Sequence, residues 1–209
     1  MGLTLSPASG LEPYCSGLLI APDWVITAGA CVGLPPDTDN PLPFEFPPEI
    51  MWVVAGTNES VVTGSSSPPP NGQLRSVTQI ITHPLFDFSE VGSVGYAVAL
   101  LKLNLPVLGV PTVALAAEPG WERTGADLYL AGYGSKVFSD ELPFGATNGK
   151  DLPQGLHYGV LDLLSEGSNP CVGWSDNIFS GSDMLCMGTL RYRRRKPPRC
   201  AGRDVTTPC

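Results

Sequence analysis

The sequence of 209 residues is poor in charge, in histidine and in long apolar runs. Charged residues make up 15% of the chain, and there are only 2 histidines. No uninterrupted apolar window reaches the about 18 residues that a membrane-spanning helix needs. Residues 1–14 lack the basic start and apolar stretch of a signal peptide. We therefore expect no membrane contact, and the sequence shows no address for export.

Basic residues are scarce before residue 191. Residues 1–190 carry 5 basic and 19 acidic side chains, a net charge of −14, whereas residues 191–209 carry 7 basic and 1 acidic side chain, a net charge of +6. The densest part of this basic tail is the run Arg191, Arg193, Arg194, Arg195 and Lys196. Such a run can bind a polyanion, be cut by a basic-specific processing protease or form a solvated loop, and all three readings stay open. Nothing in it indicates a nucleic-acid partner.

Short apolar segments separated by turns dominate the rest of the chain. Apolar residues make up 43%, enough for a core, and 24 glycines with 22 prolines are hard to reconcile with long helices. Residues 33–48 are too proline-rich for regular structure, and residues 170–179 hold the one short helix we expect. Strands are expected at 18–21, 24–28, 50–56, 74–82, 97–103, 127–133 and 156–164. This pattern predicts an all-β fold of two barrels or sandwiches.

Six cysteines are present, none of them in a C-x-x-C pair. They are consistent with a disulfide framework, with buried thiols or with metal ligands, although the zinc spacing is missing. The carboxylates form no paired or metal-spaced cluster. We therefore expect no metal and no cofactor.

Several ordered motifs along the chain carry a resemblance to a known family. Residues 15–31 read CSGLLIAPDWVITAGAC. This segment is similar to C-G-G-[ST]-L-I-x-x-x-W-V-L-T-A-A-H-C of the chymotrypsin/trypsin-like serine protease family, peptidase S1. Further along, VTQIITHPLF (77–86) and YAVALLKL (96–103) are similar to V-x-x-I-I-x-H-P-x-Y and D-I-A-L-L-K-L. LAGYG (130–134) and MLCMG (184–188) resemble V-x-G-W-G and the end of a cysteine-closed loop. The match spans residues 14–188.

The resemblance implies a fold and a set of disulfides. The fold is a double six-stranded β-barrel in one S1-like domain, 1–209, with the first barrel at 1–118 and an incomplete second barrel at 127–209. The implied disulfides are Cys15–Cys31 and Cys171–Cys186, while Cys200 and Cys209 pair together or stay free. Such disulfides fit a secreted, extracellular protein. The family's first residues and closing strands have no counterpart here, so the resemblance predicts truncation at both ends.

The catalytic triad of this family requires a serine nucleophile, a histidine base and an orienting aspartate. The histidine position falls on Ala30 and the aspartate position on Ala97. The serine position falls on Asp204 or Val205, within residues 187–209, which contain no serine. The resemblance therefore implies that no catalytic residue is present.

Other candidate residues have weaker signals. The base of the family's specificity pocket falls on Pro198, so a pocket for basic residues is not expected. His83 and His157 are expected to be structural, since neither is placed as a general base. Asn58 begins an Asn-Glu-Ser sequon, which can be glycosylated in an exported protein or arise by chance.

The resulting hypothesis is a non-catalytic serine protease homologue, a pseudoprotease. Such a protein acts by binding another protein, such as a protease, an inhibitor or another extracellular protein, or as a decoy or inhibitor. One alternative is a serine-type endopeptidase, by family resemblance or in a full-length isoform. A second alternative is a non-functional fragment.

Overall fold

The structure is a computed structural model. The chain divides into two compact units. The structure describes residues 1–5, 11, 13–36, 42–59, 67–88, 95–116, 120, 122–133, 155–165 and 185–188. The first unit comprises residues 1–115 with 154–156, and the second comprises residues 116–153 with 157–209. Each unit is described by itself below.

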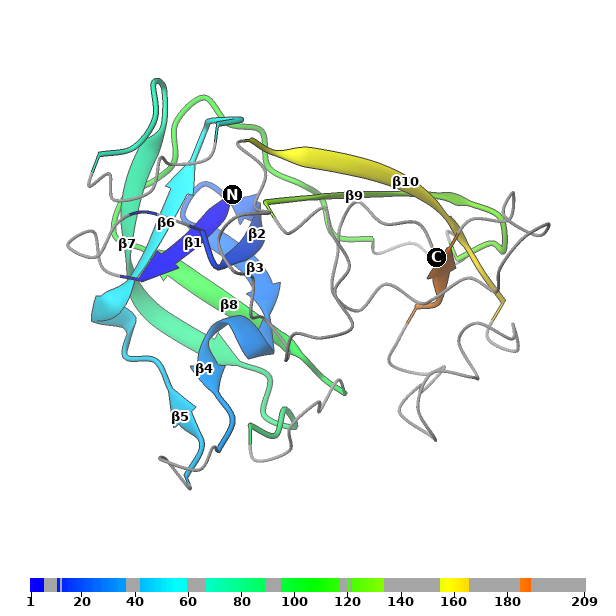
Figure 1. The fold of residues 1–209 in the computed structure, drawn as a ribbon, viewed down its shortest axis with the longest axis horizontal. Coiled ribbons are helices and arrows are strands. Elements are labelled where there is room, and N and C mark those ends of the chain that lie inside the picture. Colours follow the sequence, from blue (N-terminus) through cyan, green and yellow to red (C-terminus); the bar gives the residue numbers. More distant parts are fainter. Residues whose placement is uncertain are drawn as a thin grey trace, which may run out of the picture. The chain divides into compact units, whose positions relative to one another are not determined.

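Six antiparallel strands of the first unit close into a barrel (Figure 1). Their order around the barrel is β1-β2-β3-β8-β7-β6, so β8 joins the amino-terminal hairpin β2–β3 to the pair β6–β7. The strands are β1 (Gly2–Leu5), β2 (Cys15–Ala21), β3 (Trp24–Ala28), β6 (Met51–Ala55), β7 (Gln73–Thr82) and β8 (Val98–Leu103). Closure leaves no free sheet edge among these strands.

Alternating side chains explain why these segments form a barrel. Along β8, Ala99, Leu101 and Leu103 are buried, whereas the residues between them are only half-buried. The same period of two on β2 and β3 turns one face of each strand toward a shared core. Besides the three β8 residues, that core includes Leu3, Leu19, Val25, Met51, Val53 and Val77.

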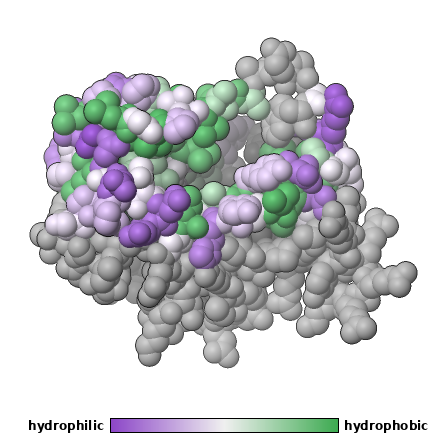
Figure 2. Space-filling model, turned by 90° about the horizontal axis from the view of Figure 1, so that it is seen from above, coloured by the Kyte–Doolittle hydropathy of each residue, from purple (hydrophilic) through white to green (hydrophobic). Residues whose placement is uncertain are grey.

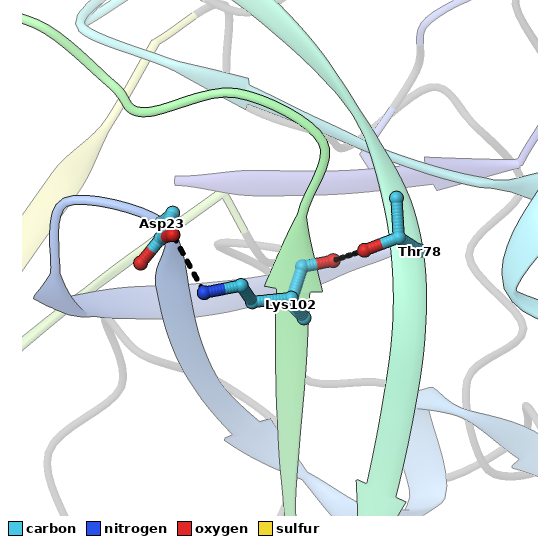
Figure 3. Close-up of polar contacts among 3 residues, drawn as sticks. All are labelled: Asp23, Thr78 and Lys102. Atoms are coloured by element: carbon cyan, nitrogen blue, oxygen red, sulfur yellow. Dashed lines mark hydrogen bonds and ion pairs between the residues drawn. The ribbon is translucent and has the colours of Figure 1, made fainter.

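A polar contact stabilises the turn between β2 and β3 (Figure 3). Lys102 Nζ on β8 lies 2.6 Å from Asp23 Oδ2 in the turn, and it also lies 4.8 Å from the ring centroid of Trp24. On the other side of β8, Thr78 Oγ1 donates a hydrogen bond of 3.2 Å to the Lys102 carbonyl oxygen. Lys102 therefore ties the turn to the centre of the sheet.

The expectation that residues 33–48 have no regular structure is wrong. Strand β4 (Gly33–Leu34) pairs with β5 (Phe44–Glu45), and a 3-10 turn, η3, covers Pro48–Ile50. A Cβ at Gly33 would lie 2.6 Å from the carbonyl oxygen of Phe44 and from the ring of Phe88, so only glycine fits there. The prolines flank the paired residues without interrupting them, which is why the short ribbon forms.

The described strands of the second unit form a three-stranded sheet in the order β11-β10-β9. They are β9 (Asp127–Gly132), β10 (His157–Leu163) and β11 (Met187–Gly188). The segment 170–179, where a helix is predicted, lies outside the described residues. A closed barrel and a partial second sheet confirm the all-β fold class. Within the described ranges no helix is long and apolar enough to cross a membrane.

Hydrophobic and hydrophilic residues are mixed over the described surface that Figure 2 shows from above.

Candidate functional site

The Cys15–Cys31 disulfide that the resemblance implies is present. It joins the start of β2 to the 3-10 turn η2 (Gly29–Cys31), which follows β3, with a Cα–Cα distance of 5.9 Å. Tyr14 Oη donates a hydrogen bond of 2.8 Å to the Cys31 carbonyl oxygen, and burial of this hydroxyl raises the pKa of Tyr14. The disulfide and this hydrogen bond hold η2 in place at the rim of the barrel.

The register between β3 and β8 brings two alanines to the same rim. Ala28, the last residue of β3, lies opposite Val98, the first residue of β8. Ala30 follows two residues later on η2 and is exposed, while Ala97 immediately precedes β8 and is half-buried. Neither methyl side chain can accept, donate or hold a proton.

Aromatic rings surround this rim. A Cβ at Gly29 would lie 2.9 Å from the Phe86 ring, so the ring packs directly against the backbone of η2. The His83 imidazole stacks on the Tyr96 ring at a centroid distance of 4.9 Å and an interplanar angle of 9°. Sequence reasoning missed this stack, and no signal in the local pattern could have revealed it.

Hydrogen bonds to the backbone and to the ring hold His83 in place. Its backbone N–H donates a hydrogen bond of 3.0 Å to the Val98 carbonyl oxygen, and its Nδ1 accepts one of 3.2 Å from the Leu85 N–H. Tyr96 is held in the left-handed region, with φ of 55°, and the Val98 N–H donates to the Tyr96 carbonyl oxygen at 2.7 Å. Ala97 thus lies inside a tight turn that presents the His83–Tyr96 stack.

The second histidine lies in the other unit. His157 is the first residue of β10, is half-buried, and pairs with Gly132 of β9. Among the described residues, no group of three His, Cys, Asp or Glu side chains could hold a metal ion.

Asn58 is exposed in the loop after β6. Its carbonyl oxygen accepts a hydrogen bond of 2.6 Å from the Leu156 N–H, and its neighbour Glu59 forms an isolated β-bridge with Gly155. The backbone at the sequon is therefore anchored while the Asn58 side chain faces solvent. Glycosylation at this position stays a prediction.

The remaining predicted residues fall outside the described part of the chain. Cys186 is buried and disulfide-bonded, but its predicted partner Cys171 is not described, so this pairing stays a prediction. The same holds for the third triad position, for the specificity pocket, for the last two cysteines and for the basic run. These residues are Asp204, Val205, Pro198, Cys200, Cys209, Arg191, Arg193, Arg194, Arg195 and Lys196.

The sequence matches the model of one known protein family over most of its length. The model of the trypsin family matches residues 3–198. The chain belongs to the trypsin family. The matched residues include strands β2 to β8 and the Cys15–Cys31 disulfide.

Curated members of the family show the same relationship at moderate identity. The chain is 34% identical over 138 residues to a trypsin of Simulium vittatum, covering 63% of this chain and 46% of that protein. It is 27% identical over 185 residues to a trypsin of Phaedon cochleariae, covering 86% and 58%. It is 28% identical over 198 residues to transmembrane protease serine 5 of Homo sapiens, covering 90% and 36%. The chain thus spans between 36% and 58% of the length of these relatives.

Proposed function

We propose that this chain is a non-catalytic member of the trypsin family, a pseudoprotease that acts by binding another protein as a decoy or inhibitor. The observation that carries the proposal is the occupation of one barrel rim by Ala30 and Ala97, at the motif positions where the family has its base and its orienting carboxylate. The sequence adds that residues 187–209 contain no serine.

The chemistry of acyl transfer supports this proposal. A serine hydroxyl attacks a peptide carbonyl only when a neighbouring base removes its proton, and the base needs a third group to orient it. In an unrelated triad enzyme, loss of the serine or the histidine alone costs on the order of 10⁶ in turnover, roughly 8 kcal/mol of transition-state stabilisation. An alanine at the base position leaves no group that can perform this proton transfer.

Exposed apolar side chains at the same end of the barrel support a protein-binding role. Leu34 and Phe44, on the paired strands β4 and β5, are each 51% exposed, and Leu85, beside the His83–Tyr96 stack, is 62% exposed. The Thr82 hydroxyl, which donates a hydrogen bond of 2.6 Å to Glu45 Oε1, links β5 to the end of β7. Large apolar side chains fixed on short, anchored strands are typical of protein-contact surfaces.

Labelling with an active-site serine phosphonate tests the proposal. The full chain, with trypsin as a positive control, is expected to remain unlabelled and to leave casein intact. Stoichiometric labelling, or casein cleavage that the phosphonate abolishes, would establish the alternative, a serine-type endopeptidase, which family membership favours. A longer isoform that carries the complete triad would be tested in the same way.

The proposed location is extracellular. It rests on family membership and on the Cys15–Cys31 disulfide, since disulfides persist in oxidising compartments. Glycosylation of Asn58 in protein recovered from a secretory host would support it. The remaining alternative, a fragment without a stable fold, is tested by calorimetry, because a folded barrel unfolds in one cooperative transition.

A further inference from the structure

The ribbon of β4 and β5, at the lower left of Figure 1, presents two apolar side chains to solvent. Leu34 lies directly opposite Phe44, and each is 51% exposed. Residues that pair across two antiparallel strands project to the same side, so these side chains form one apolar face. We call it the ribbon face. Leu42, two residues before Phe44, adds a further apolar side chain that is 76% exposed.

Aromatic rings hold the ribbon in one position. A Cβ at Gly33 would lie 2.6 Å from the Phe88 ring, so this ring packs directly against the ribbon backbone. The Phe88 ring meets the Phe86 ring edge to face at a centroid distance of 4.7 Å. Phe44 meets the buried Phe46 in the same way at 6.0 Å. Side chains that are fixed before binding lose little conformational freedom when a partner arrives.

A hydrogen bond joins the ribbon to the barrel rim that carries Ala30 and Ala97. Glu45 Oε1, on β5, accepts a hydrogen bond of 2.6 Å from the Thr82 hydroxyl. Thr82 ends β7 and lies opposite Ala99, the second residue of β8. The ribbon face and the two rim alanines therefore lie at the same end of the barrel, and the exposed carboxylate of Glu45 lies with them.

The first unit is acidic, and its basic residues lie away from this rim. Residues 1–115 carry 9 acidic and 2 basic side chains, a net charge of −7. Arg75 donates a hydrogen bond of 2.8 Å to Gln73 Oε1, and Lys102 pairs with Asp23. Arg75 lies near the start of β7 and Lys102 near the end of β8, whereas the end of β7 and the start of β8 form the rim. An anionic surface of this kind attracts a cationic partner.

We propose that the ribbon face is the docking site for a basic protein, whose contact surface places arginine or lysine side chains around an apolar anchor. The anchor packs on Leu34 and Phe44, and the cationic side chains meet the Glu45 carboxylate at the rim. Charge complementarity selects such a partner over an acidic protein or an anionic polymer. This inference rests on the proposed protein-binding function and names the chemistry of the partner.

Two fluorescent synthetic peptides of equal length serve as probes. One alternates arginine with leucine, and the other carries glutamate in place of each arginine. Fluorescence anisotropy with the full chain should detect binding of the arginine peptide alone, and added salt should weaken this binding. Equal affinity for the two peptides, or no binding of either, would overturn the proposal.

Variants of the ribbon locate the binding. Leu34→Ser/Phe44→Ser should weaken binding of the arginine peptide on the order of tenfold, as for central apolar contacts of an interface. Glu45→Gln should weaken it several-fold and reduce its dependence on salt. The matched controls are Leu108→Ser, at a side chain bonded through its backbone to the start of β7, and Glu59→Gln, in the loop after β6. Both control residues lie toward the end of the barrel opposite the rim, because the end of β6 pairs with the start of β7. Losses in the controls as large as those in the ribbon variants would reject the docking site.

Hydrogen exchange gives a second readout that needs no variant. The backbone amides of β4 and β5 in the unmodified chain should exchange more slowly with the arginine peptide bound than without it. Unchanged exchange in both strands, together with binding detected by anisotropy, would reject the ribbon as the docking site. The phosphonate test is read separately. An unlabelled chain that does not bind the arginine peptide would reject this inference alone, whereas a labelled chain that binds it at the ribbon would reject the pseudoprotease proposal alone.

Discussion

Ala28 at the end of β3 lies opposite Val98 at the start of β8, so these two strand ends meet at one rim of the barrel. Ala30 and Ala97 adjoin the same strand ends. The Cys15–Cys31 disulfide joins η2 to the start of β2. The backbone around Ala30 is therefore held in place independently of the side chain at that position.

The disulfide is expected to contribute strongly to the stability of the first unit. It closes a loop with a sequence separation of 16, for which chain entropy predicts about 3 kcal/mol. The free energies of unfolding of the oxidised chain and of the variant Cys15→Ser/Cys31→Ser, measured in denaturant, should differ by about that amount. Equal unfolding midpoints would contradict this contribution of the disulfide.

The pairing of the cysteines is tested by peptide mapping without reduction. We expect Cys15 linked to Cys31 and Cys171 linked to Cys186. A different partner for Cys186 would contradict the predicted pairing.

Removing a side chain from the barrel core should cost far more than removing an exposed one. Leu101 on β8 is fully buried, so Leu101→Ala is expected to lower the free energy of unfolding by about 2–5 kcal/mol. Leu108→Ala is the matched control, and because Leu108 is 71% exposed, its change should stay within about 0.5 kcal/mol. Chemical denaturation monitored by tryptophan fluorescence measures both, and similar losses for the two variants would contradict the barrel core.

The fold could be predicted mainly where strand partners are close in sequence. The hairpin of β2 and β3 follows from two apolar runs around the Pro22-Asp23 turn, and both strands form at those positions. Strand β1 was missed because its four residues, Gly2–Leu5, become a strand by pairing with β6, which is distant in sequence. The ribbon of β4 and β5 could not be predicted, because the prolines of residues 33–48 fall outside the two pairs of residues that form it.

The same contrast applies to the candidate site. Ala30 lies just after β3 and Ala97 just before β8, because the apolar runs that predict these two strands end and begin there. That the two alanines stand at the triad positions stays a prediction. The His83–Tyr96 stack could not be foreseen, since it depends on a left-handed backbone at Tyr96 that no residue pattern requires. The exposure of Tyr129 and Tyr158 on one side of the second-unit sheet was also unforeseen, because the register of β9 against β10 decides which side chains share a side.

The ion pair between Asp23 and Lys102 is expected to contribute little on its own. Each side chain is 32% exposed, and solvent screening limits such pairs to about 1 kcal/mol or less. A double-mutant cycle with Asp23→Asn and Lys102→Met should give a coupling energy in that range, which falls as salt increases. Because Lys102 also contacts the Trp24 ring, Lys102→Met should cost more than Asp23→Asn. A coupling energy well above this range would mean that the pair is effectively buried.

Tyr14 should make the first unit sensitive to alkali. Tyr14 is 41% exposed as a residue, but its hydroxyl is desolvated where it meets the Cys31 carbonyl. Desolvation raises the pKa of this hydroxyl above the ordinary value of 10.0, so the unfolded chain loses the proton at a lower pH than the folded chain does. Stability from this group is therefore fully present below pH 10.0 and declines as the pH rises above it. The loss of stability above that pH should be steeper for the unmodified chain than for Tyr14→Phe. Parallel stability curves for the two would show that the hydroxyl is not held at the Cys31 carbonyl.

The basic run, Arg191, Arg193, Arg194, Arg195 and Lys196, is expected to bind a polyanion. Its five positive charges in six residues should retain the chain on a heparin column at low salt, and screening beyond about 10 Å at 0.1 M salt should release it steeply as salt rises. Changing Arg193, Arg194, Arg195 and Lys196 to Ser should advance elution. Equal elution of the serine-substituted run and the unmodified chain would mean that these residues bind no polyanion and form only a solvated segment.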